Sequence, residues 1–181
     1  MDWLLIAVIG IVAMALLFDF TNGFHDAANS VSTVVATRVL PARWAPPFSA
    51  VFNFLAYFVV GTAVASTVAK TVKSDFATVA VIFAAVFAAV AWNYITWHFG
   101  MPSSSSHAII GGLVGAGIAA GGLNAIAWGS VQKAVIGIVA SPAVAILIAF
   151  IAMYIIFGIQ NLFKLHDNHP IFKGLQLVAA G

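Results

Sequence analysis

From residue 22 to residue 29 the sequence reads Asn-Gly-Phe-His-Asp-Ala-Ala-Asn, and this polar stretch interrupts an otherwise apolar region. Residues 3–18 before it and residues 30–37 after it carry no charged side chain. A charged group in the middle of a bilayer costs about 3 kcal/mol on insertion scales, so its presence there indicates a functional site. In a helix, Asn22, Asp26 and Asn29 share one face because they are spaced at i, i+4 and i+7.

Gly23 lies inside this stretch and gives the backbone freedom to bend or unwind. Unwinding would free carbonyl and N–H groups, which inside a membrane must find a partner such as a bound ion. We therefore expect a broken first helix, with one segment ending near residue 22 and a second running from residue 24 to about residue 37.

The composition is that of an integral membrane protein. Of the 181 residues, 63% are hydrophobic and 7% are charged, with a mean hydropathy of +1.10, whereas soluble domains have about 25% charged residues. The sequence predicts an all-α, multi-pass protein of the cell membrane. It contains no cysteine, which excludes disulfides and thiolate metal sites. It also lacks a run of Lys and Arg, so we expect no nucleic-acid partner.

Apolar segments of about 20 residues, the length that a bilayer requires, mark the transmembrane spans. We expect about four to five spans, including residues 3–22, 48–69, 76–99 and 131–163. Residues 100–127 are uncharged, start with Pro102 and four serines, and include six glycines after residue 107. This pattern predicts a re-entrant helical hairpin, which is tolerated where it is buried in protein. Residues 1–181 form a single transmembrane domain, in which residues 164–173 are a surface loop and residues 174–181 start a truncated further helix.

The first candidate site contains Asn22, Asp26 and Asn29, with His25 and Asp19 beside them. Carboxylate and carboxamide oxygens suit a small hard cation such as Na⁺, and a partly buried carboxylate suits proton carriage. We expect no other metal here. The alternative interpretation is a polar cluster that joins two helices, as we expect for the isolated Asn53 and Asn93.

The second candidate site is the serine run Ser104, Ser105 and Ser106, between Pro102 and His107. A helix N-terminus attracts anions through its unpaired N–H groups and its partial positive charge, and serine hydroxyls add further donors. Such a site can hold an oxyanion without a fixed cation and release it again. A serine run of this kind can also be a simple helix cap. Its occurrence together with the first site favours the functional interpretation.

Two motifs resemble those of the PiT family of inorganic phosphate transporters. Residues 22–31 match the pattern Asn-Gly-Phe-His-Asp-x-Ala-Asn-x-Val, and residues 100–111 match Gly-x-Pro-x-Ser-Ser-Ser-His-x-x-Ile-Gly. Residues 51–54 and 92–93 are also similar, so the resemblance covers nearly the whole chain. It implies alternating-access phosphate transport coupled to H⁺ or Na⁺ and no other cofactor. It also implies that Asp26 and Asn29 bind the coupling ion and phosphate, and that the three serines contact phosphate.

The family pattern also implies an inverted repeat in which each motif occurs twice, whereas this sequence contains each motif once. The resemblance therefore covers the N-terminal half of the family's fold. Either a separate C-terminal half completes the site, or two copies associate as an antiparallel homodimer. A half-site facing lipid would leave polar groups unpaired at several kcal/mol each. We expect phosphate, membrane lipid and one of these protein partners.

Other functions remain open at this stage. Serine hydroxyls and a helix end would also suit sulfate or another oxyanion, and a decayed half could be a non-transporting membrane scaffold. Ser106, His107 and Asp26 include the residue types of a hydrolase triad. The sequence has no G-x-S-x-G elbow, however, and adjacent serine and histidine side chains on a helix point in different directions. We therefore do not expect an enzyme.

Overall fold

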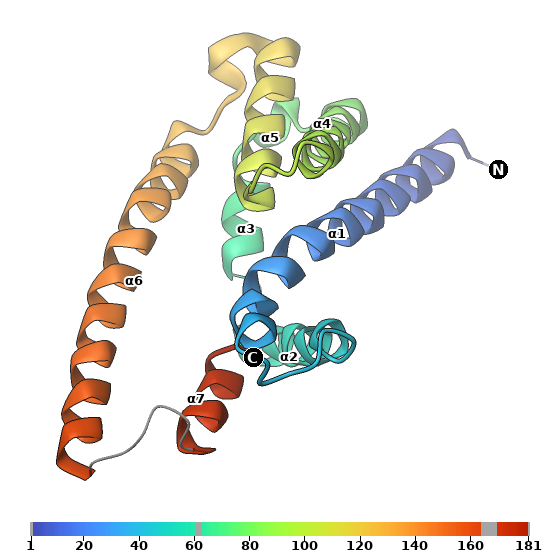
Figure 1. Cartoon of the computed structure of the whole chain (residues 1–181). Coiled ribbons are helices and arrows are strands. Elements are labelled where there is room, and N and C mark those ends of the chain that lie inside the picture. The colour runs from blue at the N-terminus through green and yellow to red at the C-terminus, as the bar shows by residue number, and fades with distance from the viewer. Residues whose placement is uncertain (1, 61–62, 164–169, 181) are drawn as a thin grey trace. The chain divides into compact units, whose positions relative to one another are not determined.

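The computed structural model describes residues 2–60, 63–163 and 170–180, and most of them are helical. The order is α1 (Trp3–Ala36), α2 (Ala45–Val60), α3 (Ala63–Ala69), η1 (Ser74–Phe76), α4 (Val79–His98), α5 (Ser105–Gly121), η2 (Gly122–Ala125), α6 (Trp128–Phe163) and α7 (Pro170–Ala180), where η marks a short 3₁₀ helix (Figure 1). The extended pairing within the described ranges is one isolated antiparallel bridge, between Val72 and Ile126. The predicted all-α class is confirmed.

Four segments of the described chain are long and apolar enough to cross a membrane: Trp3–Ala36, Val79–His98, Ser105–Ala125 and Trp128–Leu162. Large apolar side chains on them are exposed, as Phe150 and Tyr154 show with exposed fractions of 70% and 78%. Surfaces of this kind need lipid or further protein against them. The span expected at residues 48–69 falls on α2, α3 and residues 61–62, of which the last two lie outside the described ranges.

The predicted break in the first helix is not observed, because α1 is a single helix of 34 residues that runs through Gly23. A glycine inside a helix costs only about 1 kcal/mol relative to alanine. An open turn in an apolar environment would leave backbone groups unpaired, and each of these costs several kcal/mol. The continuous helix therefore has a lower free energy than a helix with an unwound turn at Gly23.

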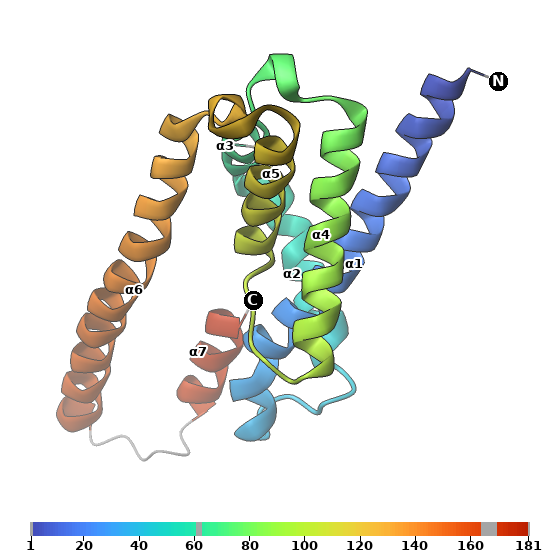
Figure 2. The same ribbon diagram turned by 90° about the horizontal axis from the view of Figure 1, so that it is seen from above.

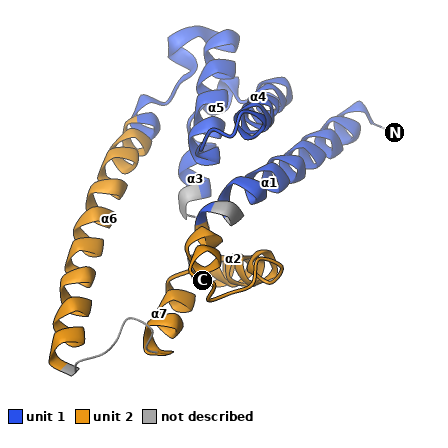
Figure 3. Cartoon of the chain, viewed as in Figure 1, with its two compact units in different colours: residues 1–29, 60–131 blue, residues 30–59, 132–181 orange. Residues whose placement is uncertain are grey.

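The described chain divides into two compact units, to which both α1 and α6 contribute (Figure 3). The first unit comprises residues 1–29 and 60–131, and the second comprises residues 30–59 and 132–181. Residues 164–169 of the predicted surface loop lie outside the described ranges. From residue 170 the chain is helical, so α7 includes the helix start that the sequence suggested at residues 174–181.

In the first unit, α4 and α5 lie side by side and run in opposite directions (Figure 2). The contact is close at Gly112, where an added Cβ would overlap the carbonyl oxygen of Ala85. The connection between the two helices also folds tightly, because the Met101 N–H donates to the Thr96 carbonyl at 2.8 Å. A small residue at position 112 thus sets how near the two backbones come.

Near the C-terminal end of α5, the segment of residues 71–73 is hydrogen-bonded to the segment of residues 125–127. The Lys73 N–H donates to the Ala125 carbonyl at 2.9 Å, and the Ala127 N–H donates to the Thr71 carbonyl at 3.0 Å. The ring of Phe76 lies against Gly121, where a Cβ would overlap it. These contacts join the segment before α4 to the segment before α6.

The second unit has a small core of its own. Val31, Val34, Ala45 and Ala180 are buried together, so parts of α1, α2 and α7 share one apolar cluster. Beside it the Ser30 and Ser49 hydroxyls lie 3.1 Å apart. Polar contacts of this kind hold helices together where apolar burial gives no preference over lipid.

We predict that Gly112→Ala lowers the stability of the protein whereas Gly111→Ala does not. The first change forces α4 and α5 apart and should cost about 1–3 kcal/mol. The second places its methyl group where no atom lies within 4 Å. Thermal unfolding of the detergent-solubilised variants, followed by tryptophan fluorescence, checks the difference. Equal midpoints for the two variants would contradict the close contact.

Candidate functional site

The side chains of the polar stretch of α1, residues 19–29, differ in burial. Thr21 and His25 are buried, with exposed fractions of 4% and 8%. Asp19, Asp26 and Asn29 are exposed, and Asn22 is half-buried. Successive residues of a helix are rotated by about 100°, so i, i+4 neighbours such as Thr21 and His25 share a face that Asp26 does not.

The buried face of this stretch contacts α4 through Asn93, which is completely buried. His25 Nε2 lies 2.9 Å from the Asn93 main-chain oxygen. The Asn93 carboxamide Nδ2 donates to Thr21 Oγ1 at 3.3 Å, and the Thr21 hydroxyl donates to the Phe18 carbonyl at 2.9 Å. The interpretation of Asn93 as a link between helices is confirmed. Asn53 differs, because its Nδ2 donates to Ser49 on its own helix at 3.2 Å.

The serine run stands at the N-terminus of α5, where the three side chains have different surroundings. Ser104 is the N-cap residue, but its side chain makes no capping hydrogen bond. Ser105 is 5% exposed, and its hydroxyl has no hydrogen-bond partner within the described chain. Ser104 and Ser106 are exposed. The first turn of a helix also presents N–H groups without intrahelical partners.

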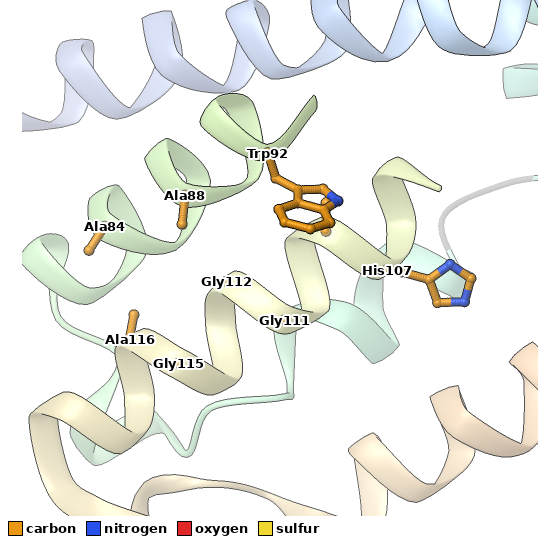
Figure 4. A pocket seen from close by; sticks show the side chains of 9 residues that line it. Ala84, Ala88, Trp92, His107, Gly111, Gly112, Gly115 and Ala116 are labelled. Atoms are coloured by element: carbon orange, nitrogen blue, oxygen red, sulfur yellow. The ribbon is translucent and has the colours of Figure 1, made fainter. Parts of the chain in front are cut away.

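A groove of about 560 Å³ lies between α4 and α5, beyond the serine run (Figure 4). Its walls are the small residues of both helices, with Trp92 and His107 at the end nearest the serines. The Trp92 indole lies over the first turns of α5, and its Nε1–H donates to Ser103 Oγ at 3.1 Å. Ser103, the first of the four consecutive serines, thereby links the segment before α5 to Trp92 of α4.

The two candidate groups belong to the same unit, because residues 1–29 and 60–131 include all six of their principal side chains: Asn22, Asp26, Asn29, Ser104, Ser105 and Ser106. They do not share either of the two described cavities. The first is formed by α4 and α5 alone, and the second, near the start of α1, is lined by residues that include Trp3 and Phe83. Sequence reasoning also missed Thr21, although its i, i+4 spacing from His25 is a signal of a shared contact.

The chemistry of the two groups is complementary. A carboxylate and carboxamide oxygens accept hydrogen bonds and attract cations, as at Asp26 and Asn29. Serine hydroxyls and the N-terminus of α5 donate hydrogen bonds and attract anions. One unit therefore offers elements for both a cation and an oxyanion.

Curated proteins of similar sequence are phosphate transporters by name. A probable low-affinity inorganic phosphate transporter of Rhizobium meliloti is 44% identical over 177 residues, which cover 96% of this chain and 52% of that protein. A protein of the same description from Bacillus subtilis is also 44% identical, and the match covers 99% of this chain and 55% of the relative. The chain thus spans about half the length of these relatives.

The fold is similar to that of a solved structure, described as the sodium-dependent phosphate transporter. The TM-score is 0.77 with 30% sequence identity, and the match covers 83% of this chain and 39% of the other. The relation therefore includes the arrangement of helices as well as the motifs.

The sequence profile of the phosphate transporter family matches residues 22–179, which include both candidate groups. This family and the relatives are transporters and not enzymes. With several apolar helices of membrane-spanning length, the chain is a multi-pass membrane protein. The resemblance inferred from the two motifs is confirmed, and the chain belongs to the phosphate transporter family.

Proposed function

We propose that this chain provides one half of an ion-coupled inorganic phosphate transporter that works by alternating access. The observation that carries the proposal is the N-terminus of α5, where Ser104 makes no capping bond and Ser105 has a buried hydroxyl without a partner in the described chain. A buried polar group without a partner is costly. A bound oxyanion would supply the missing acceptor.

The start of α5 has more hydrogen-bond donors than a helix cap needs, and this excess suits phosphate. Three consecutive hydroxyls and the first-turn N–H groups give more donors than a cap uses, and an oxyanion has several acceptor oxygens to match them. No Lys or Arg lies between residues 76 and 132. The site therefore binds the anion through neutral donors, which permits release.

The coupling ion, H⁺ or Na⁺, is assigned to Asp26 and Asn29 with Asn22 beside them. A cation there offsets the charge of the carboxylate and of phosphate, so the two ligands bind together and leave together. This coupling is what alternating access requires of a symporter. Asp19 and His25 belong to the same sequence-based group, and the Nε2 of His25 is engaged with the Asn93 main-chain oxygen.

We predict that Asp26→Asn abolishes phosphate uptake into proteoliposomes while the protein remains folded and inserted. Asparagine keeps the shape but removes the charge that holds the cation. Asp75→Asn is the matched control, because Asp75 lies in the short helix η1 outside both candidate groups. Radiolabelled phosphate uptake, with Na⁺ and H⁺ gradients applied in turn, is the measurement.

Uptake that responds to neither gradient would refute the coupling. Uptake that sulfate blocks as well as phosphate does would refute phosphate as the specific substrate. A fully active Asp26→Asn variant would remove Asp26 from the site.

We predict that Ser105→Ala raises the KM for phosphate about tenfold without lowering the thermal midpoint. Its hydroxyl has no protein partner in the described chain, so removal loses no hydrogen bond of the folded protein. The control is Ser49→Ala, which loses contacts to Ser30 and Asn53. This control should lower stability by about 1 kcal/mol and leave KM unchanged. The reverse pattern would show that Ser105 is only a packing residue.

The other half of the pathway is assigned to a second copy in antiparallel orientation, with a separate C-terminal half as the alternative. Asp26 is exposed on a helix that is long and apolar enough to cross a membrane. A carboxylate in that position needs protein, water or an ion beside it. Two antiparallel copies would place two such carboxylates and two serine runs around one central path.

We predict that Gly23→Cys crosslinks to itself between subunits in lipid, whereas Gly10→Cys does so much less. Both positions lie on α1 with no atom within 4 Å of an added Cβ, and the chain has no native cysteine. They are separated by about 20 Å along the helix. An antiparallel two-fold axis near Asp26 brings only the first pair together. Equal crosslinking at both positions would indicate a parallel dimer, and none at either would indicate a different partner.

A further inference from the structure

In the contact between α1 and α4, one residue of α4 binds two side chains of α1. Asn93 offers its main-chain oxygen to His25 and its carboxamide Nδ2 to Thr21. The Thr96 hydroxyl lies 3.1 Å from the same main-chain oxygen and 2.8 Å from that of Trp92. These bonds are buried, so water competes little for them.

The chemistry of the His25 bond fixes the form of the imidazole. A carbonyl oxygen only accepts hydrogen bonds, so His25 Nε2 must carry a proton and donate it. Nδ1 is then the nitrogen at which a second proton would bind. The bond to Asn93 forms with neutral imidazole and with imidazolium alike, so it does not require a change of charge.

The charged and titratable groups around this contact are few. On α1 they are Asp19 and Asp26, and both are exposed. On α4 they are Tyr94 and His98, because this helix contains no Asp, Glu, Lys or Arg. No carboxylate of α4 is therefore available as a partner for His25.

A ring contact extends the same helix pair. The rings of Phe24 and Trp97 lie 5.5 Å apart between centroids. Together with the Thr21 and His25 bonds, this contact joins one short stretch of α1 to α4. Rotation matters because Asp26 follows His25 by one residue, or about 100° around the helix.

We propose that His25 is a positioning residue of the transport site rather than a ligand of the coupling ion. With Thr21 and Asn93, it holds the rotation of α1 so that the Asp26 side chain stays exposed beside the contact with α4. The inference rests on the proposed function in one respect, namely that Asp26 and Asn29 bind the transported ions. The rotation itself can be measured without transport.

The first test compares His25→Gln with His25→Leu in phosphate uptake. Glutamine can donate an N–H to the Asn93 carbonyl but takes up no proton, whereas leucine does neither. We expect His25→Gln to keep the KM for phosphate within about twofold and to keep the pH profile of uptake. We expect His25→Leu to raise KM about tenfold, as the loss of one buried hydrogen bond would.

A milder variant tests the same contact in case the His25→Leu protein does not fold. Thr21→Val keeps the shape of the side chain but removes the acceptor for Asn93, and it should raise KM in the same direction. Thr37→Val is its control just beyond the end of α1, because that hydroxyl makes no bond to α4: it donates to the Thr33 carbonyl at 2.8 Å and lies 3.2 Å from Gln176 Oε1. This control should leave KM unchanged.

The second test reports the rotation of α1 directly. A cysteine at position 26 is labelled with a water-soluble maleimide in the membrane, in the background of each His25 variant. We expect equal labelling rates with histidine and glutamine, and a rate at least fivefold lower with leucine. This readout remains valid if the chain shows no uptake at all, so failure of the proposed function is distinguishable from failure of this inference.

Three results would overturn the inference. A His25→Gln protein that loses the pH dependence of uptake would make His25 a proton carrier. A His25→Leu protein with unchanged KM would show that the bond has no effect on the site. Labelling at position 26 that is the same in all backgrounds would show that the bond does not set the rotation.

Discussion

The hydrogen bonds between Asn93 and the side chains of Thr21 and His25 are the interactions on which the placement of α1 beside α4 depends. Helices in a membrane gain little from burying apolar surface against each other, because lipid is equally apolar. Polar contacts between them therefore decide which faces meet. Here one buried asparagine bonds to Thr21 and His25 on one face of α1, whereas the neighbouring Asp26 carboxylate is exposed.

The sequence was sufficient to predict the class of the protein and the two motifs, because these depend on composition and spacing. It also identified Asn93 as a residue that joins helices. It did not predict that, of the neighbours His25 and Asp26, the first is buried and the second exposed, because the burial of a side chain depends on which helix lies beside it. Thr21 was overlooked for the same reason, since its hydroxyl becomes informative only opposite Asn93.

The break expected at Gly23 shows a different limit of sequence reasoning. Glycine permits unwinding but does not force it, and the balance depends on whether a ligand is present to take the freed backbone groups. In the structure α1 is continuous through this residue. For the serine run, the sequence predicted the location at the start of α5. It did not predict that Ser105 is buried between two exposed serines.

The lengths of α1 and α6 relate the chain to the thickness of its membrane. At about 1.5 Å per residue, 34 and 36 residues correspond to about 51 and 54 Å, whereas the hydrocarbon core measures about 30 Å. A straight helix of this length would have to tilt beyond the usual range of about 0–40° or extend into the headgroup region. Either adjustment carries an energy that changes with bilayer thickness, so the surrounding lipid contributes to the conformation of both helices.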